Sequence, residues 1–154
     1  MDKKFFNCKV RFQKMAENGT SKTVTESYLV DALSYTEAES SFIEYITPYM
    51  SGDFEVVGIN RYHLSEIFTS DEESADKWYR AKIYFITLDE KSGLEKRTST
   101  FMLVQAADLR DAVKKLDEGM KGTMADYEIA SMAETNIMDV VFYEHNVKEV
   151  KHYD

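Results

Sequence analysis

The chain has 154 residues, of which 44% are hydrophobic and 13% aromatic, and its formal net charge is −9. This composition excludes a disordered or low-complexity chain, and the length suits one domain or two small, closely packed halves. The acidity also argues against nucleic-acid binding, because proteins of that class ordinarily present a basic face to the phosphates.

The cysteine content and the N-terminal residues further limit the class of protein that the sequence can encode. Cys8 is the only cysteine, so neither an intramolecular disulfide nor a metal cluster built from cysteines can form. The N-terminus lacks the apolar run of a signal peptide, and no stretch approaches the roughly 20 apolar residues that a membrane span needs. The sequence therefore predicts a cytoplasmic protein without a membrane segment.

The first predicted element is a hairpin. Apolar and polar residues alternate over residues 6–13, which is the period of a strand with one buried face. Asn18-Gly19 predicts a tight turn, and the β-favouring run 23–30 then returns antiparallel to the first strand.

A helix and one or two strands follow the hairpin. Ser34 and Glu37 form a capping box, in which side chains satisfy backbone N–H groups at the start of a helix. Pro48 ends this helix, residues 54–59 read as a strand, and a further short strand is expected over 64–68.

The second half of the chain repeats the first. Residues 79–85 reproduce the alternation of residues 6–12 at an offset of 73 positions. Lys91-Ser92-Gly93 predicts the second hairpin turn, and the returning strand over 96–104 has an offset of 74, as one extra residue in this hairpin would produce.

The second helix and the strands after it match in the same way. Asp108 and Asp111 open the helix, Gly119 and Gly122 close it, and a strand begins at Asp126. A last strand over 137–143 corresponds to residues 64–68 and beyond. The paired helix positions are Tyr35 and Leu109, Ala38 and Ala112, Phe42 and Leu116, and Ile46 and Met120.

These elements predict an α+β fold of two internally duplicated ββαβ(β) units with pseudo-twofold symmetry. We expect a mostly antiparallel sheet with two helices packed on it, because neither unit can bury the apolar face of its sheet alone. The predicted organisation is a first repeat over 1–69, an acidic connection over 70–77, a second repeat over 78–143 and a polar tail over 144–154, all within one compact domain.

No motif for nucleotide, metal or acyl-transfer chemistry is present, which makes an enzyme the less favoured class and predicts neither a cofactor nor a metal. His63 is interpreted as a loop or strand-edge residue, and His145 and His152 lie in the polar tail without a ligand set. Glu55 and Glu128 occupy corresponding positions, so they are either an acid/base pair at the pseudo-axis or two polar strand residues.

One basic stripe is the best candidate site. Alternate positions on the two first strands carry Lys9 and Arg11 in one copy and Arg80, Lys82 and Tyr84 in the other. Such a stripe suits phosphates or an acidic partner, with Tyr84 available for stacking. The structural alternative is a solvated sheet face with cross-strand ion pairs.

The repeated hairpin, followed by Leu103-Val104-Gln105-Ala106-Ala107-Asp108-Leu109-Arg110-Asp111-Ala112, carries a resemblance to a known family. With Trp78-Tyr79 and Asp126-Tyr127-Glu128-Ile129, it resembles small uncharacterised proteins of gut-type bacteria and their phages, described as a domain of unknown function. The resemblance covers nearly all of residues 4–143 and implies a stand-alone cytoplasmic protein. It implies no activity, ligand or catalytic residue.

Three functional hypotheses follow. The leading one is a non-enzymatic binding or regulatory module that acts through a protein partner or through self-association. The second is binding of nucleic acid or a phosphate-bearing ligand on the basic stripe, and the third is an enzyme with a site at the pseudo-twofold axis.

Overall fold

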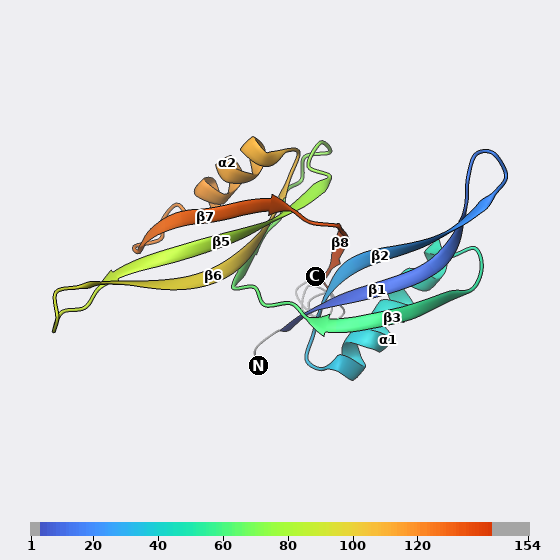
Figure 1. Cartoon of the computed structure of the whole chain (residues 1–154), viewed down its shortest axis with the longest axis horizontal. Coiled ribbons are helices and arrows are strands. Elements are labelled where there is room, and N and C mark those ends of the chain that lie inside the picture. Colours follow the sequence, from blue (N-terminus) through green and yellow to red (C-terminus); the bar gives the residue numbers. More distant parts are fainter. Residues whose placement is uncertain (1–3, 143–154) are drawn as a thin grey trace, which may run out of the picture. The chain divides into compact units, whose positions relative to one another are not determined.

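The computed structural model describes residues 4–142, which form two four-stranded sheets, each with one α-helix (Figure 1). The chain divides into two compact units. Of the described residues, unit 1 contains 4–63 and 136–142, and unit 2 contains 64–135. Each unit is described separately.

Unit 1 is built on the first predicted hairpin. Strands β1 (Lys4–Met15) and β2 (Ser21–Ala32) pair antiparallel, and β3 (Phe54–Arg61) pairs antiparallel with β1. Helix α1 (Tyr35–Ile46) continues into the short 3-10 helix η1 (Thr47–Tyr49), where Pro48 stands at the position predicted to end the helix. The sheet order is β3-β1-β2-β8.

Unit 2 has the same order of elements. Strands β5 (Lys77–Leu88) and β6 (Glu95–Ala106) form the second hairpin, and β7 (Asp126–Glu134) pairs antiparallel with β5. Helix α2 (Leu109–Gly119) connects β6 to β7, and the sheet order is β4-β6-β5-β7.

The fourth strand of each sheet comes from the other half of the sequence. β4 (Glu66–Phe68) directly follows the strands of unit 1, yet it pairs parallel with β6 of unit 2. β8 (Ile137–Val141) follows β7, yet it pairs parallel with β2 of unit 1. The compact units therefore differ from the predicted repeats, since each repeat contributes its last strand to the other unit.

A hydrophobic core lies between the sheet and the helix in each unit. In unit 1 the buried cluster includes Phe6, Val10 and Phe42, and in unit 2 it includes Ile83 and Leu116. Strand alternation supplies one row of these side chains and helical periodicity supplies the other. The first pair of predicted helix positions, Tyr35 and Leu109, is exposed.

The α+β class and the packing of two helices on mostly antiparallel sheets are confirmed. Both units also carry one extra residue at corresponding places in the edge strand, Val57 in β3 and Ala130 in β7, where the pairing register shifts. The duplication of the sequence and the pseudo-twofold symmetry stay predictions. The polar tail, 144–154, lies outside the described residues.

Candidate binding surface

Each helix covers one face of its own sheet, and the predicted stripe residues lie on the opposite faces. In β1, Phe6 and Val10 belong to the core cluster, so Lys9 and Arg11 point away from α1. In β5, Ile83 belongs to the core, which places Arg80, Lys82 and Tyr84 on the face away from α2. We call these the open faces.

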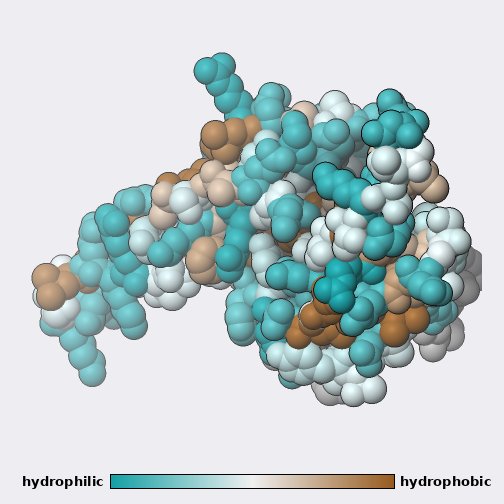
Figure 2. All heavy atoms as spheres, turned by 45° about the vertical axis from the view of Figure 1, so that its right-hand side comes forward, coloured by the Kyte–Doolittle hydropathy of each residue, from teal (hydrophilic) through white to brown (hydrophobic). Residues whose placement is uncertain are grey.

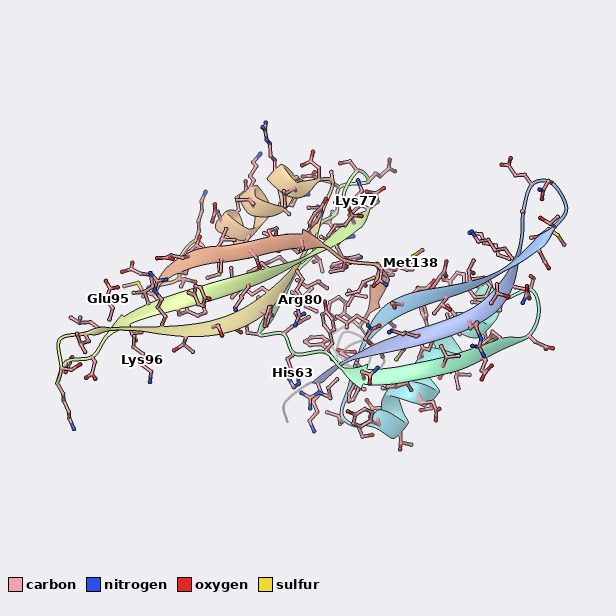
Figure 3. The ribbon with its side chains drawn as sticks, in the orientation of Figure 1. His63, Lys77, Arg80, Glu95, Lys96 and Met138 are labelled. Carbon is pink, nitrogen blue, oxygen red and sulfur yellow. The ribbon has the colours of Figure 1, made fainter. Side chains whose placement is uncertain are left out.

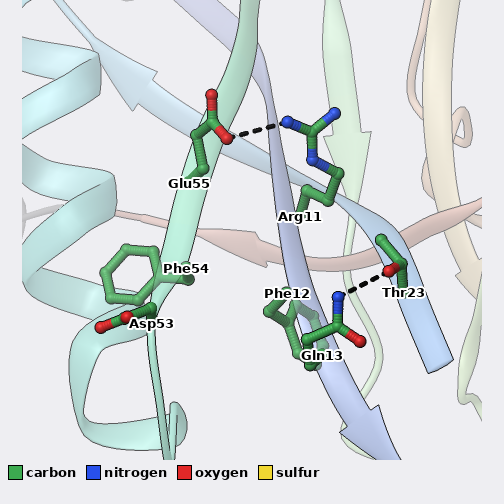
Figure 4. Close-up of a pocket in the computed structure, with 7 residues that line it drawn as sticks. All are labelled: Arg11, Phe12, Gln13, Thr23, Asp53, Phe54 and Glu55. Atoms are coloured by element: carbon green, nitrogen blue, oxygen red, sulfur yellow. Dashed lines mark hydrogen bonds and ion pairs between the residues drawn. The ribbon is translucent and has the colours of Figure 1, made fainter. Parts of the chain in front are cut away.

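The open face of unit 1 contains a shallow hollow of about 360 Å³ (Figure 4). Inside it, an Arg11 Nη2 group lies 2.8 Å from Glu55 Oε2, and Gln13 Nε2 donates a hydrogen bond of 2.6 Å to Thr23 Oγ1. Each of these polar groups already has an ion-pair or hydrogen-bond partner. The hollow therefore offers little unbalanced charge to an anion, and Lys9 is the cation of this face that makes no ion pair within residues 4–142.

The open face of unit 2 gathers cations around aromatic rings. The Lys82 Nζ atom lies 5.4 Å from the centre of the Tyr84 ring, and the Arg97 Cζ atom lies 5.7 Å from the same centre. The Arg80 Cζ atom lies 3.9 Å from the centre of the Phe101 ring. At these distances the negative face of a ring attracts a cation, so each ring favours the observed position of the basic groups beside it.

Glu128 offsets part of this charge. Arg97 Nη2 lies 3.2 Å from Glu128 Oε1, and about half of each of these side chains is exposed. Lys82 forms no ion pair in the part of the chain that the structure describes. The residues of this basic aromatic surface are Arg80, Lys82, Tyr84, Arg97, Phe101 and Glu128.

The sequence prediction identified only part of this surface. It named the three residues of β5 but missed Arg97 on the neighbouring strand β6. Since Arg97 and Phe101 are four residues apart on one strand, they share a face, and the hairpin register places that face beside Tyr84. The pairing register of the second hairpin could therefore have identified Arg97 as part of this surface.

The two glutamates proposed as an acid/base pair each have an arginine partner in their own unit. Glu55 pairs with Arg11 and Glu128 with Arg97. His63 lies in the segment between β3 and β4, and no group of three potential metal ligands occurs within residues 4–142. His145 and His152 lie outside the described residues.

The acidic connection is a loop of unit 2 up to residue 76, and β5 begins at Lys77. Lys115 of α2 holds this loop, since its Nζ atom lies 3.3 Å from Glu72 Oε2 and 2.9 Å from Asp111 Oδ2. The backbone N–H of Ala107 and then the Lys115 ammonium lower the pKa of the Asp111 carboxyl below its ordinary value. Glu72 of this segment thus attaches the loop to the helix.

The profile of a protein family described as a domain of unknown function (DUF4494) matches residues 4–143. The chain belongs to this family. The match confirms the resemblance, and every residue of the basic aromatic surface lies inside the DUF4494 region. A bacterial or phage origin stays a prediction. A comparison with curated proteins finds no match.

Neither helix within residues 4–142 has both the length and the apolar character needed to cross a bilayer.

Proposed function

We propose that this DUF4494 protein is a non-enzymatic binding module that acts through a protein partner, and that the basic aromatic surface of unit 2 is its contact. The observation that carries the proposal is the concentration of Arg80, Lys82 and Arg97 around two aromatic rings, on a chain whose net charge is −9. Aromatic residues and arginine are the side chains most enriched at protein interfaces.

The chemistry of this surface favours an acidic partner. Lys82 makes no ion pair among residues 4–142, and together with the neighbouring Arg97 it attracts carboxylates and speeds encounter with a negatively charged surface. On the face that Figure 2 shows, apolar residues form small patches between hydrophilic ones.

Nucleic acid is the second candidate ligand, because the same cations could contact phosphates. Two features make it less favoured. The chain as a whole is acidic, and the Tyr84 ring already has two cations near it, Lys82 and Arg97, which compete with a base for its face. Self-association, a catalytic site at the pseudo-axis and the cytoplasmic location remain predictions.

The test compares charge reversal on the two open faces. Tagged wild-type protein, the double variant Lys82→Glu with Arg97→Glu, and the control Lys9→Glu are used to capture partners from cell extract, with and without nuclease treatment. We expect the wild type and the control to retain one or more acidic proteins in stoichiometric amount and the double variant to lose them.

Two results would reject the proposal. One is capture that survives reversal of both charges, and the other is an interaction that disappears on nuclease treatment, which would transfer the surface to nucleic acid. Circular dichroism of the double variant shows whether the fold is retained, and this is the expected result because Arg97 is exposed and Lys82 is only half-buried on the face away from the core.

A further inference from the structure

The outer edges of the two sheets differ in how they are protected. β3 and β7 are edge strands of their sheets, and each is interrupted by an extra residue, Val57 and Ala130. An irregular edge of this kind disfavours the addition of another strand, because its N–H and C=O groups no longer form a regular row. These two edges are poor docking sites.

The opposite edges are only partly covered. β8 pairs with β2 between Ser27 and Val30, and β4 pairs with β6 between Met102 and Val104. Beyond these short pairings, the segments 21–26 of β2 and 95–100 of β6 have no strand on their outer side among residues 4–142. Each is the end of a long hairpin, as Figure 1 shows.

Backbone groups of the uncovered part of β6 point outward at every second residue. The Asp89 N–H donates to the Leu94 carbonyl across the hairpin, and the Ser65 N–H donates to the outward-facing carbonyl of Phe101. Because orientations alternate along a strand, the N–H and C=O groups of Arg97 and Ser99 also face outward. They are positioned to pair with one more strand.

Charge distinguishes the two uncovered segments. The segment in β2 carries Lys22 and Glu26, which balance, and Glu26 already accepts a hydrogen bond from the Tyr28 hydroxyl. The segment in β6 carries Glu95, Lys96 and Arg97. Arg97 pairs with Glu128, but the segment also lies near Lys82, which makes no ion pair among residues 4–142. Figure 3 shows Glu95 and Lys96 near the free end of the hairpin.

We infer that the uncovered edge of β6, residues 95–100, binds an extended acidic segment of a partner protein by β-strand addition. The backbone of Arg97 and Ser99 supplies the hydrogen bonds, and the cations on both faces of β6 select carboxylates in the added strand. This inference rests on the proposed function and specifies the form of the partner.

A second copy of the chain fits the edge less well in the registers that are centred on its cations. If two β6 edges paired antiparallel about Arg97, the two Arg97 side chains would lie opposite each other. If they paired about Lys96, the two Lys96 side chains would lie opposite each other. Like charges in opposite positions are unfavourable. A separate acidic strand meets no such repulsion.

The test uses a fluorescein-labelled synthetic peptide in which glutamate alternates with valine, and measures its fluorescence anisotropy with the full-length protein. In either register such a peptide places its carboxylates beside Arg97 or beside Lys96. A matched peptide with lysine in place of glutamate tests whether binding depends on the sign of the peptide's charge. Labelled oligothymidylate tests whether the protein binds nucleic acid instead.

Ser99→Pro removes an outward N–H and places a ring on the edge, while the hydrogen bonds between β5 and β6 stay intact. We expect this variant to bind the glutamate peptide at least about tenfold more weakly, which is the loss of about one hydrogen bond. Thr25→Pro is the matched control, because Thr25 has the corresponding outward orientation on β2, and it should bind like the wild type.

Three results would overturn the inference: no binding of the glutamate peptide by the wild type, equal binding by Ser99→Pro, or a preference for the lysine peptide or for oligothymidylate. The proposed function can survive this failure. If the partner captured from extract depends on Lys82 and Arg97 but is retained by Ser99→Pro, the surface binds proteins and the edge does not. If capture of the partner depends neither on Lys82 and Arg97 nor on Ser99, both the proposed function and the inference about the edge are rejected.

Discussion

The two units differ where the fourth strand of each sheet meets the helix. In unit 2, a Cβ atom on Gly119 would lie only 2.5 Å from Cε1 of Phe68, a residue of β4. In unit 1 the corresponding positions hold Tyr45 on α1 and Val141 on β8, and both pack against the core. The large side chain thus belongs to the strand in one unit and to the helix in the other.

This difference explains how each fourth strand fits its own unit. β4 carries a phenylalanine that needs the space left by a glycine, and α1 offers a tyrosine at that position. β8 carries a valine, which leaves room for a tyrosine. Complementary sizes of this kind favour one arrangement of similar strands over another, because a close-packed interior tolerates neither overlap nor a void.

The largest expected effect comes from removing the space at Gly119. Gly119→Ala should lower the free energy of unfolding by about 1–3 kcal/mol, because the Phe68 ring must move away from its place beside the helix. Trp78, the only tryptophan, is 3% exposed and lies in unit 2, so its fluorescence during urea unfolding measures this loss.

Shortening the opposing side chain should reverse that loss. In the double variant Gly119→Ala with Phe68→Val, we expect part of the stability to return, since valine is the residue that unit 1 uses at the corresponding position. Two destabilisations that simply add would show that the ring and the helix are not in the contact described here.

Removing the side chain that caps each helix should lower the free energy of unfolding by an intermediate amount, and the loss should be greater in unit 2. Ser34 Oγ accepts the Glu37 N–H at 3.1 Å, and Asp108 Oδ1 accepts the Asp111 N–H at 2.8 Å. Each change to alanine should cost about 1 kcal/mol, and Asp108→Ala should cost a few tenths more because its charge also interacts with the helix dipole.

Urea denaturation of the two alanine variants and of Asp108→Asn separates these contributions. Asparagine keeps the hydrogen bond and removes the charge, so its loss should be smaller than that of alanine. Greater destabilisation from Ser34→Ala than from Asp108→Ala would contradict the comparison of the two caps.

The smallest effect is a difference in chemical reactivity. Cys8 is 0% exposed in unit 1, and the corresponding core residue of unit 2 is Ala81. Burial, and secondarily the charge of Glu39, raises the pKa of the Cys8 thiol from 9.0 to about 12. The thiol should therefore resist a disulfide reagent near pH 8 until unit 1 opens.

The pH dependence has a defined direction. Since the folded pKa lies above the unfolded value, the stabilisation associated with the protonated thiol is present below pH 9 and is lost as the pH rises toward 12. Reaction in native protein as fast as in denaturant would show that Cys8 is accessible. Comparison of thiol labelling with Trp78 fluorescence then shows whether the units open together.

Much of the fold could be predicted from periodicity and turn chemistry. Ser34 and Asp108 marked the helix starts, and the glycines at positions 19 and 93, which have positive φ, marked the hairpin turns. The extra residue of the second hairpin also followed from the offset, since its loop covers 89–94 against 16–20 in the first.

The exchange of β4 and β8 could not be predicted in the same way. Alternation tells which face of a strand is buried, but it does not identify the neighbouring strand, and residues 64–68 read as a strand in either unit. The candidate surface was incomplete for a related reason. Arg97 joins it through cross-strand register, which depends on how the hairpin pairs and not on the pattern of a single strand.

Strand exchange also sets an order for folding during synthesis. Unit 2 is continuous in sequence from residue 64 to residue 135, whereas unit 1 needs β8, whose Val141 pairs with Val30 near the other end of the chain. The hairpin of β1 and β2 therefore leaves the ribosome well before β8, and its β2 edge stays uncovered throughout that interval. The part made first is completed last, so we expect nascent chains to depend most on chaperones through unit 1.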